Sequence, residues 1–194
     1  MRILHHVAIY LAVVSFGQAS MPQTTARLQK PDTPALAEWR TRVPAIQKIL
    51  EASDEWNCRG APAPGIVDAF GLSTDRLSVA LVEYCSRGAY TESLVPILLN
   101  KGRPVKAHFR DAAGKNTVPE LLSGASVMHT RSAKLVAEKR AIFDEFADND
   151  SQGKLSTCGV KAYVWNSNTR TFDLNVRLSR SASAEFCRQA RAGR

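Results

Sequence analysis

The sequence predicts an α+β fold: an antiparallel, β-rich domain of hairpins with a small N-terminal helical lobe, stapled by disulfides. Residues 160–165 and 171–178 alternate apolar and polar side chains around the turn-forming stretch 166–169, which is typical of a hairpin with one buried face. Apolar residues between positions 36 and 50 recur every three or four residues, as on one helix face. All four cysteines follow an N-terminal export signal.

The first residues indicate a targeting segment. Arg2 precedes an apolar stretch from Val7 to Phe16, and the small residues Gly17 and Ala19 predict cleavage after Ala19. A membrane-spanning helix needs about 20 apolar residues, so this stretch is too short for one. We therefore expect a signal peptide at 1–19 and a mature protein that is periplasmic in a Gram-negative cell, or secreted, with no transmembrane segment after cleavage.

Residues 20–33 are polar and predict a flexible leader, and 34–57 predict the helical lobe. Thr33 can cap this lobe and Pro34 suits a first helical position. Pro44 interrupts the apolar stripe and predicts a kink or two consecutive helices. The stripe consists of Leu36, Trp39, Val43, Ile46 and Leu50.

An antiparallel β domain is expected over 77–188, after a connecting segment rich in proline and glycine at 59–74. The first strands form a meander of 77–84, 94–99 and 105–109, in which apolar residues recur at every second position. Pro96 has no N–H for a sheet ladder, which argues for an edge strand or a bulge.

The segment 133–146 has helical composition but fits neither a helical nor a strand period. The following stretch, 148–155, resembles the first half of an EF-hand loop, with oxygen-bearing side chains at alternate positions and Gly153 at the sixth. The alternative is a polar turn between two strands, since Gly159 replaces the bidentate glutamate. The candidate calcium ligands are Asp148, Asp150 and Gln152.

An even number of cysteines in an oxidising compartment predicts two disulfides. Four cysteines allow three connectivities; the local one pairs Cys58 with Cys85 and Cys158 with Cys187. Each would close a loop of about 30 residues and contribute roughly 3–4 kcal/mol in the chain-entropy model. A zinc site is disfavoured, because no close CxxC pair is present.

Positive charge gathers at the C-terminal end. Removing the signal peptide takes away Arg2 alone and lowers the net charge from +8 to +7. From Lys154 onward there are eight basic and two acidic residues, ending in a basic tail at 189–194. This asymmetry predicts an anionic envelope component or a periplasmic protein as partner, rather than nucleic acid; the alternative is a merely solvated surface. The candidate binding residues are Lys161, Arg177, Arg180, Arg188 and Arg191.

No catalytic motif of the GxSxG, HExxH, P-loop or GxGxxG type occurs in the chain. The leading hypothesis is a non-enzymatic exported protein that binds an envelope partner through the basic C-terminal hairpin. The alternatives are a calcium-stabilised domain and a small hydrolase built around His129, with Ser123 as a candidate nucleophile. No cofactor other than calcium is expected.

Several short landmarks carry a family resemblance. They are Tyr84 to Tyr90, Phe143-Asp144, Gly153 to Leu155, Cys158-Gly159, Val164-Trp165, Phe172 to Leu174 and Cys187-Arg188. In this order they resemble an exported bacterial family known as domain of unknown function 1176, over about residues 77–188. The resemblance implies Gram-negative export and a strand before Asp144, which favours β structure for 133–146. It implies no reaction.

Overall fold

The computed structural model describes residues 34–53, 63–72, 77–84, 92–126 and 128–192. The predicted signal peptide, the leader, Cys58 and Cys85 lie outside these residues. The described residues are mostly β-sheet with a few helices, so the β-rich α+β class is confirmed.

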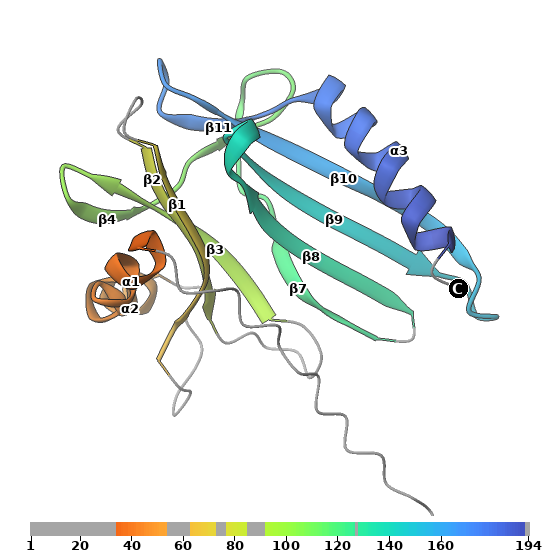
Figure 1. Cartoon of the computed structure of the whole chain (residues 1–194), viewed down its shortest axis with the longest axis horizontal. Helices are drawn as coiled ribbons and strands as arrows, with labels where there is room; N and C mark the ends of the chain where they lie inside the picture. Colours follow the sequence, from red (N-terminus) through yellow and green to blue (C-terminus); the bar gives the residue numbers. More distant parts are fainter. Residues whose placement is uncertain (1–33, 54–62, 73–76, 85–91, 127, 193–194) are drawn as a thin grey trace, which may run out of the picture. The chain divides into compact units, whose positions relative to one another are not determined.

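One sheet runs through the described part of the chain in the order β1-β2-β3-β7-β8-β9-β10-β11-β5-β6, with β4 as a further partner of β3 (Figure 1). Its pairs are antiparallel except for β5 and β11, where Phe109 lies beside Phe172. The strands are β1 Gly65–Leu72, β2 Leu77–Tyr84, β3 Glu92–Asn100, β4 Arg103–Lys106, β5 Phe109–Arg110, β6 Asn116–Thr117, β7 Leu121–Ala125, β8 His129–Val136, β9 Ala141–Asn149, β10 Leu155–Asn166 and β11 Thr171–Leu174.

The predicted helical lobe consists of two consecutive helices, α1 Pro34–Arg40 and α2 Val43–Glu51. Pro44 stands in the first turn of α2, where its missing N–H removes no helical hydrogen bond. Trp39 is buried, and its indole N–H donates to the Ser78 hydroxyl at 3.2 Å. The lobe therefore packs on the sheet rather than standing apart from it. Its buried residues Leu36, Trp39, Ile46 and Leu50 form one cluster with Ala69, Ala80, Val82 and Ile97.

The expectation that residues 59–74 only connect the lobe to the β domain is wrong. Residues Gly65–Leu72 form strand β1, which pairs antiparallel with β2. The β domain therefore begins before Leu77. The two glycines and Asp68 of this stretch weaken the strand pattern, although the strand buries Ala69 and Phe70.

The second core cluster lies on the opposite face of β2, because successive strand residues point to opposite sides. It contains Val79 and Leu81 from β2, and aromatic residues from β5, β10 and β11. The Phe109 ring stands edge-on to Tyr163 at 5.1 Å and stacks with Phe172 at 5.7 Å. These contacts fix the short strand β5 to the core.

Strand β3 changes partner along one side. Residues 92–94 pair with β7, and residues 97–100 pair with β4. Pro96 falls between the two partners, where its carbonyl accepts a hydrogen bond from the Ala107 N–H at 2.9 Å. Of the two predicted alternatives, an edge strand or a bulge, the edge strand is wrong, because β3 is an inner strand of the sheet. The missing donor of Pro96 is tolerated because the ladder is interrupted at that point.

The ambiguous segment 133–146 is β structure, as the family resemblance implies. Strand β8 ends at Val136, a single 3-10 turn covers Ala137–Lys139, and β9 follows. Arg140 adopts a positive φ of 49° at the junction. This stretch forms strands despite its helical composition, because β9 pairs with β8 on one side and with β10 on the other.

The predicted final strand, 171–178, is wrong beyond Leu174. Strand β11 ends there, and helix α3 extends over Val176–Ala192. The Asn175 side chain starts the helix by accepting the Leu178 N–H at 2.9 Å. The expected basic tail is, up to Ala192, the last turn of this helix. No helix in the described part of the chain combines the length and apolarity that a membrane span needs.

Helix α3 lies along the part of β10 that β11 leaves uncovered (Figure 1). The Val160 N–H donates to the Ser183 hydroxyl at 2.8 Å, and the Ala162 N–H donates to the Ser179 hydroxyl at 2.9 Å. The Asn175 N–H in turn donates to the Ala162 carbonyl at 2.8 Å. Helix side chains and backbone thus replace a neighbouring strand.

The predicted disulfide between Cys158 and Cys187 is confirmed, with Cα atoms 5.7 Å apart. It joins the start of β10 to the last third of α3, so the helix is held at both ends.

Candidate functional site

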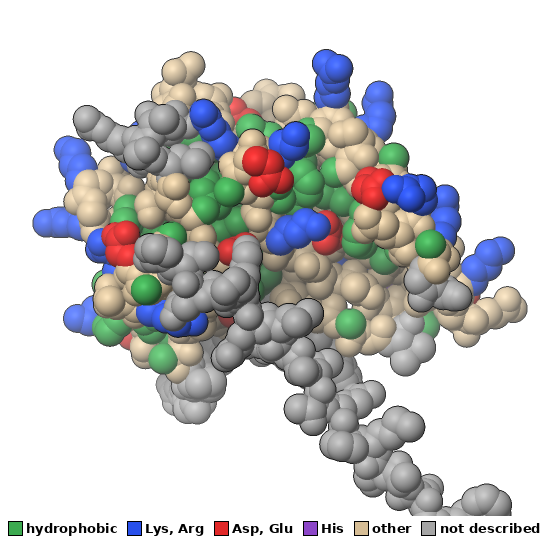
Figure 2. All heavy atoms as spheres, viewed as in Figure 1, with side chains coloured by type: hydrophobic (Ala, Val, Ile, Leu, Met, Phe, Trp, Pro, Cys, Tyr) green, Lys and Arg blue, Asp and Glu red, His purple; other side chains and the backbone are tan. Residues whose placement is uncertain are grey.

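The candidate arginines lie on the exposed side of α3. Arg177, Arg180, Arg188 and Arg191 fall within roughly 80° of arc at 3.6 residues per turn. All four arginines are exposed, whereas Ser179 and Ser183 bind β10 and Cys187 is bonded to Cys158. Figure 2 shows Lys and Arg side chains projecting along the edge that α3 occupies in the same view.

Most of this positive charge is not neutralised within the helix. Arg188 pairs with Glu185, three residues earlier. Within the described residues, Arg177, Arg180 and Arg191 have no ion-pair partner. The pair with Arg188 holds the pKa of Glu185 below its usual value. We call Arg177, Arg180, Arg188 and Arg191 the α3 arginine face.

Lys161 does not belong to that face, although the sequence predicts it as a binding residue together with the four arginines. The side chain of Cys158 is directed toward α3, and odd-numbered residues of β10 point to the other side of the sheet. Lys161 lies opposite Asp144 of β9. It is therefore part of a separate group of charges.

Asp144 is a buried carboxylate on β9, two residues after Ile142 of the second core cluster. Burial raises its pKa above the usual value, and the positive charges of Lys161 and Arg131 oppose that rise. Burial, together with Asp144, raises the pKa of the nearby Tyr163 to about 12. In the sequence, Asp144 stands out only as part of the Phe143-Asp144 landmark. Its neighbours became visible only with the register of β8, β9 and β10.

Asp148 is the centre of a polar cluster that joins three strands. Its Oδ1 accepts from Arg131 at 2.6 Å and lies 3.0 Å from His129 Nδ1, while Oδ2 accepts from the Thr157 hydroxyl at 3.0 Å. The bonds from Arg131 and His129 hold the Asp148 pKa at about 2. The Arg131 guanidinium also lies 5.8 Å from the centre of the Phe146 ring.

The candidate calcium loop forms a tight turn between β9 and β10. Oδ1 of Asp150 accepts the N–H groups of Gln152 and Lys154 at 2.9 and 2.8 Å. Among the described residues, no three His, Cys, Asp or Glu side chains are grouped to hold a metal ion. Calcium binding by Asp148, Asp150 and Gln152 stays a prediction.

The candidate hydrolase residues are placed on neighbouring strands. His129 starts β8 and contacts Asp148, whereas Ser123 of β7 lies opposite Glu92 of β3. A histidine held by a carboxylate can act as a base only on a nucleophile within hydrogen-bond reach. The register does not place Ser123 opposite His129, so this hydrolase site stays a prediction without geometric support.

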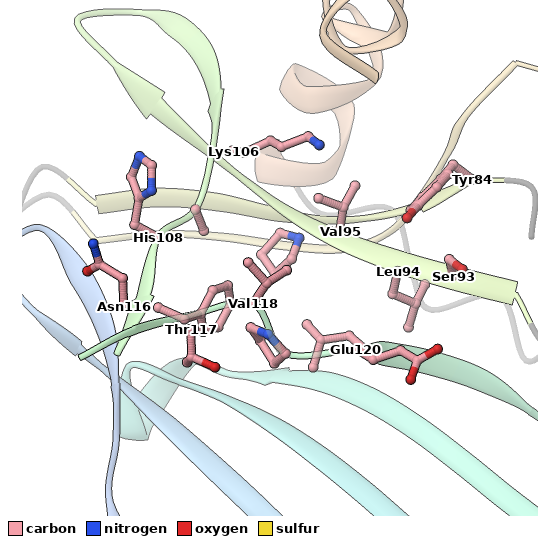
Figure 3. A pocket seen from close by; sticks show the side chains of 15 residues that line it. Tyr84, Ser93, Leu94, Val95, Lys106, His108, Asn116, Thr117, Val118 and Glu120 are labelled. Carbon is pink, nitrogen blue, oxygen red and sulfur yellow. The ribbon is translucent and has the colours of Figure 1, made fainter. Parts of the chain in front are cut away.

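The structure adds a pocket that the sequence did not indicate. It has a volume of about 600 Å³ and lies where β3 exchanges β7 for β4 (Figure 3). Its walls come from β3, from the end of β4 and from the segment 116–121, which returns the chain to β3. The only sequence signal was Pro96, which interrupts the ladder at this point.

The pocket is mainly apolar with a few polar groups. Apolar walls are provided by Leu94, Val95, Pro96, Ala107, Phe109, Val118, Pro119 and Leu121. Polar groups come from Tyr84, Lys106, His108 and Glu120. His108 is exposed, as its alternation with Lys106 and Arg110 predicts.

Comparison of the chain with protein-family models, with curated proteins and with solved structures finds no match. The resemblance to domain of unknown function 1176 stays a prediction.

Proposed function

We propose that this chain is an exported, non-enzymatic binding protein that contacts an anionic component of the bacterial envelope through the α3 arginine face. The observation that carries the proposal is the exposure of Arg177, Arg180, Arg188 and Arg191 within one arc of α3. Guanidinium groups bind phosphate and carboxylate groups through paired hydrogen bonds, which suits an anionic surface.

The helix is also held in place more firmly than an isolated surface helix. Ser179 and Ser183 bind the backbone of β10, and the Cys158–Cys187 bond fixes the far end. A preorganised row of charges loses less conformational entropy on binding than a flexible tail. This supports a contact surface more than a merely solvated one. The disulfide also suits an exported protein.

The test compares charge reversal on α3 with charge reversal elsewhere. Arg177→Glu combined with Arg180→Glu should weaken binding to anionic lipid vesicles and to purified cell wall by roughly tenfold or more, at about 1 kcal/mol per basic residue near a charged surface. Lys115→Glu with Lys154→Glu is the matched control, since both lysines are exposed and lie in turns.

Co-sedimentation at about 50 and 300 mM salt gives the second readout. Screening acts over about 10 Å at 0.1 M, so retention of the wild type should fall steeply with salt. Both double variants should stay within about 1 kcal/mol of the wild-type stability, as expected for exposed sites. Equal retention of the wild type and the α3 variant on both materials would rule the proposal out.

A further inference from the structure

We propose that the partner of the α3 arginine face is an extended phosphate polymer that bridges two arginine pairs, and not the surface of a lipid bilayer. This inference rests on the proposed function, because it names the partner of that same face. The first pair is Arg177 with Arg180, and the second is Arg188 with Arg191. All four side chains are exposed.

The two pairs repeat along the helix in nearly the same direction. Arg188 follows Arg177 by 11 residues, as Arg191 follows Arg180. At about 3.6 residues per turn and 1.5 Å per residue, this spacing is close to three full turns and roughly 17 Å. The whole row from Arg177 to Arg191 is about 21 Å long. A small anion can occupy one pair, whereas only an elongated ligand reaches both.

The surface between the pairs leaves room for a polymer. Ala184 lies seven residues after Arg177, which is about two turns, so it falls within the same arc. It is exposed and carries only a methyl group. Glu185, the acidic residue of α3, lies outside the arc and is bonded to Arg188 and Gln189. A chain that runs from one pair to the other therefore meets no bulky or acidic side chain of α3.

The apolar side of α3 is not free to enter a bilayer. Helices that lie in a bilayer surface bury an apolar face about 5–10 Å into it. In α3 the half-buried residues share the side on which Ser179 and Ser183 bind β10, and the bond between Cys158 and Cys187 holds that side in place. Within this helix, Val176 at its start is the one exposed apolar side chain larger than alanine. The half-buried residues are Leu178, Ser179, Ala182, Ser183, Phe186, Cys187 and Ala190.

Paired arginines suit a phosphate group better than a carboxylate. Helix side chains three residues apart have Cβ atoms roughly 5–6 Å from each other, so two guanidinium groups can reach one anionic group. One bidentate arginine occupies both oxygens of a carboxylate, whereas a phosphate group has further acceptor oxygens for a second guanidinium. In a polymer, the second arginine pair then binds another phosphate of the same chain, at the high effective concentration that linkage gives.

Calorimetric titration of the full chain with triphosphate and with long-chain polyphosphate tests the bridging. Triphosphate is shorter than the spacing between the pairs, so polyphosphate should bind at least about a hundredfold more tightly. Arg177→Gln with Arg180→Gln, and separately Arg188→Gln with Arg191→Gln, should each lower polyphosphate affinity at least about tenfold and triphosphate affinity less than about threefold. Equal losses for the two probes, or equal affinity of the two probes for the wild type, would overturn the proposal.

A second pair of variants tests the path of the polymer. Ala184→Glu places a carboxylate between the arginine pairs and should weaken polyphosphate binding severalfold more than Gln189→Glu. The control adds the same charge at an exposed position of α3 outside the arc. Urea unfolding checks that both variants are folded. Equal effects of the two variants on polyphosphate binding would show that the polymer does not run along the arc.

Two further probes separate the partner classes. Deca-glutamate extends to about 33 Å, long enough to reach both pairs, and should bind more weakly than polyphosphate of matched length. Equal or tighter binding of deca-glutamate would make the partner an acidic peptide and overturn the choice of phosphate. A monolayer of anionic lipid should show no rise in surface pressure that depends on Arg177 and Arg180, and such a rise would mean that α3 enters a bilayer.

The proposed function and this inference can fail separately. If polyphosphate has no advantage over triphosphate, but Arg177→Glu with Arg180→Glu still weakens binding to anionic vesicles and cell wall, the bridging polymer is wrong and the α3 arginine face remains a contact surface.

Discussion

Gly159 of β10 lies directly beneath the ring of Phe146 on β9. The two residues are opposite each other in the register, and a Cβ atom built on Gly159 would fall 2.7 Å from Cζ of Phe146. The ring therefore occupies the space that any other residue at 159 would need. Arg131 covers the Phe146 ring from β8, which limits its freedom to move.

Gly159→Ala should lower the free energy of unfolding by about 1–3 kcal/mol, because the methyl group overpacks a confined ring. Urea unfolding measures the change. Gly71→Ala is the control, since its Cβ would meet nothing closer than 3.9 Å. In a Phe146→Ala background, Gly159→Ala should have little effect. A loss of the same size in both backgrounds would show that the ring is not the cause.

Ser183→Ala should destabilise the protein by about 1–3 kcal/mol, because it leaves the Val160 N–H at the edge of β10 without its acceptor. Ser181→Ala on the same helix is the matched control, since its exposed hydroxyl only donates to the Leu178 carbonyl. Hydrogen exchange should show faster exchange at Val160 in Ser183→Ala alone. If the Val160 amide exchanges equally fast in both variants, the Ser183 hydroxyl is not its acceptor.

Replacing both Cys158 and Cys187 by alanine should lower the free energy of unfolding by roughly 3–4 kcal/mol, as expected for a loop closed across 29 residues. Mass spectrometry of the unreduced protein should recover the linked peptides. An unchanged urea midpoint in the double variant would mean that α3 is held by its other contacts alone.

The free energy of unfolding at acidic pH should depend on the ionisation of the Asp148 carboxylate. Its pKa is lowered from 3.8 to about 2, so its contribution is present above about pH 4 and is lost as the pH falls toward 2. Asp148→Asn should be less stable than the wild type at about pH 5, by ~1–2 kcal/mol, and the difference should close near pH 2. Guanidinium unfolding across this range gives the two curves. If the unfolding free energies of the wild type and of Asp148→Asn change in parallel with pH, Asp148 is not the source of the acid dependence.

The β-rich class, the paired helices and the Cys158–Cys187 bond could be predicted from periodicity, proline positions and cysteine spacing. The end of β11 could not, because Phe172, Leu174, Val176 and Leu178 continue a strand pattern across a helix boundary. Asn175 was the contrary signal, as a helix N-cap. The serines at 179 and 183 also share one helix face, at a spacing of four residues.

The neighbours of the charged side chains depend on how β8, β9 and β10 are aligned with one another, and the sequence alone does not define this register. Lys161 was predicted to bind a partner together with Arg177, but the alignment of β10 with β9 places it opposite Asp144. The pocket could not be predicted from the sequence either. Its walls come from segments that meet only because β3 pairs with β7 at one end and with β4 at the other. Pro96 marked the place, but a missing N–H does not say what fills the gap.

The order of β10 and α3 along the chain has a consequence for biosynthesis, because α3 is synthesised after the strand that it covers. Strand β10 is complete at Asn166, but Ser179 and Ser183, which bind its edge, are synthesised after it. Until those residues are available, the N–H groups of Val160 and Ala162 have no acceptor, and an unpaired edge of this kind attracts strands from other chains. A nascent or truncated chain that stops before Ser179 is therefore expected to aggregate more readily than a chain in which α3 covers the edge of β10.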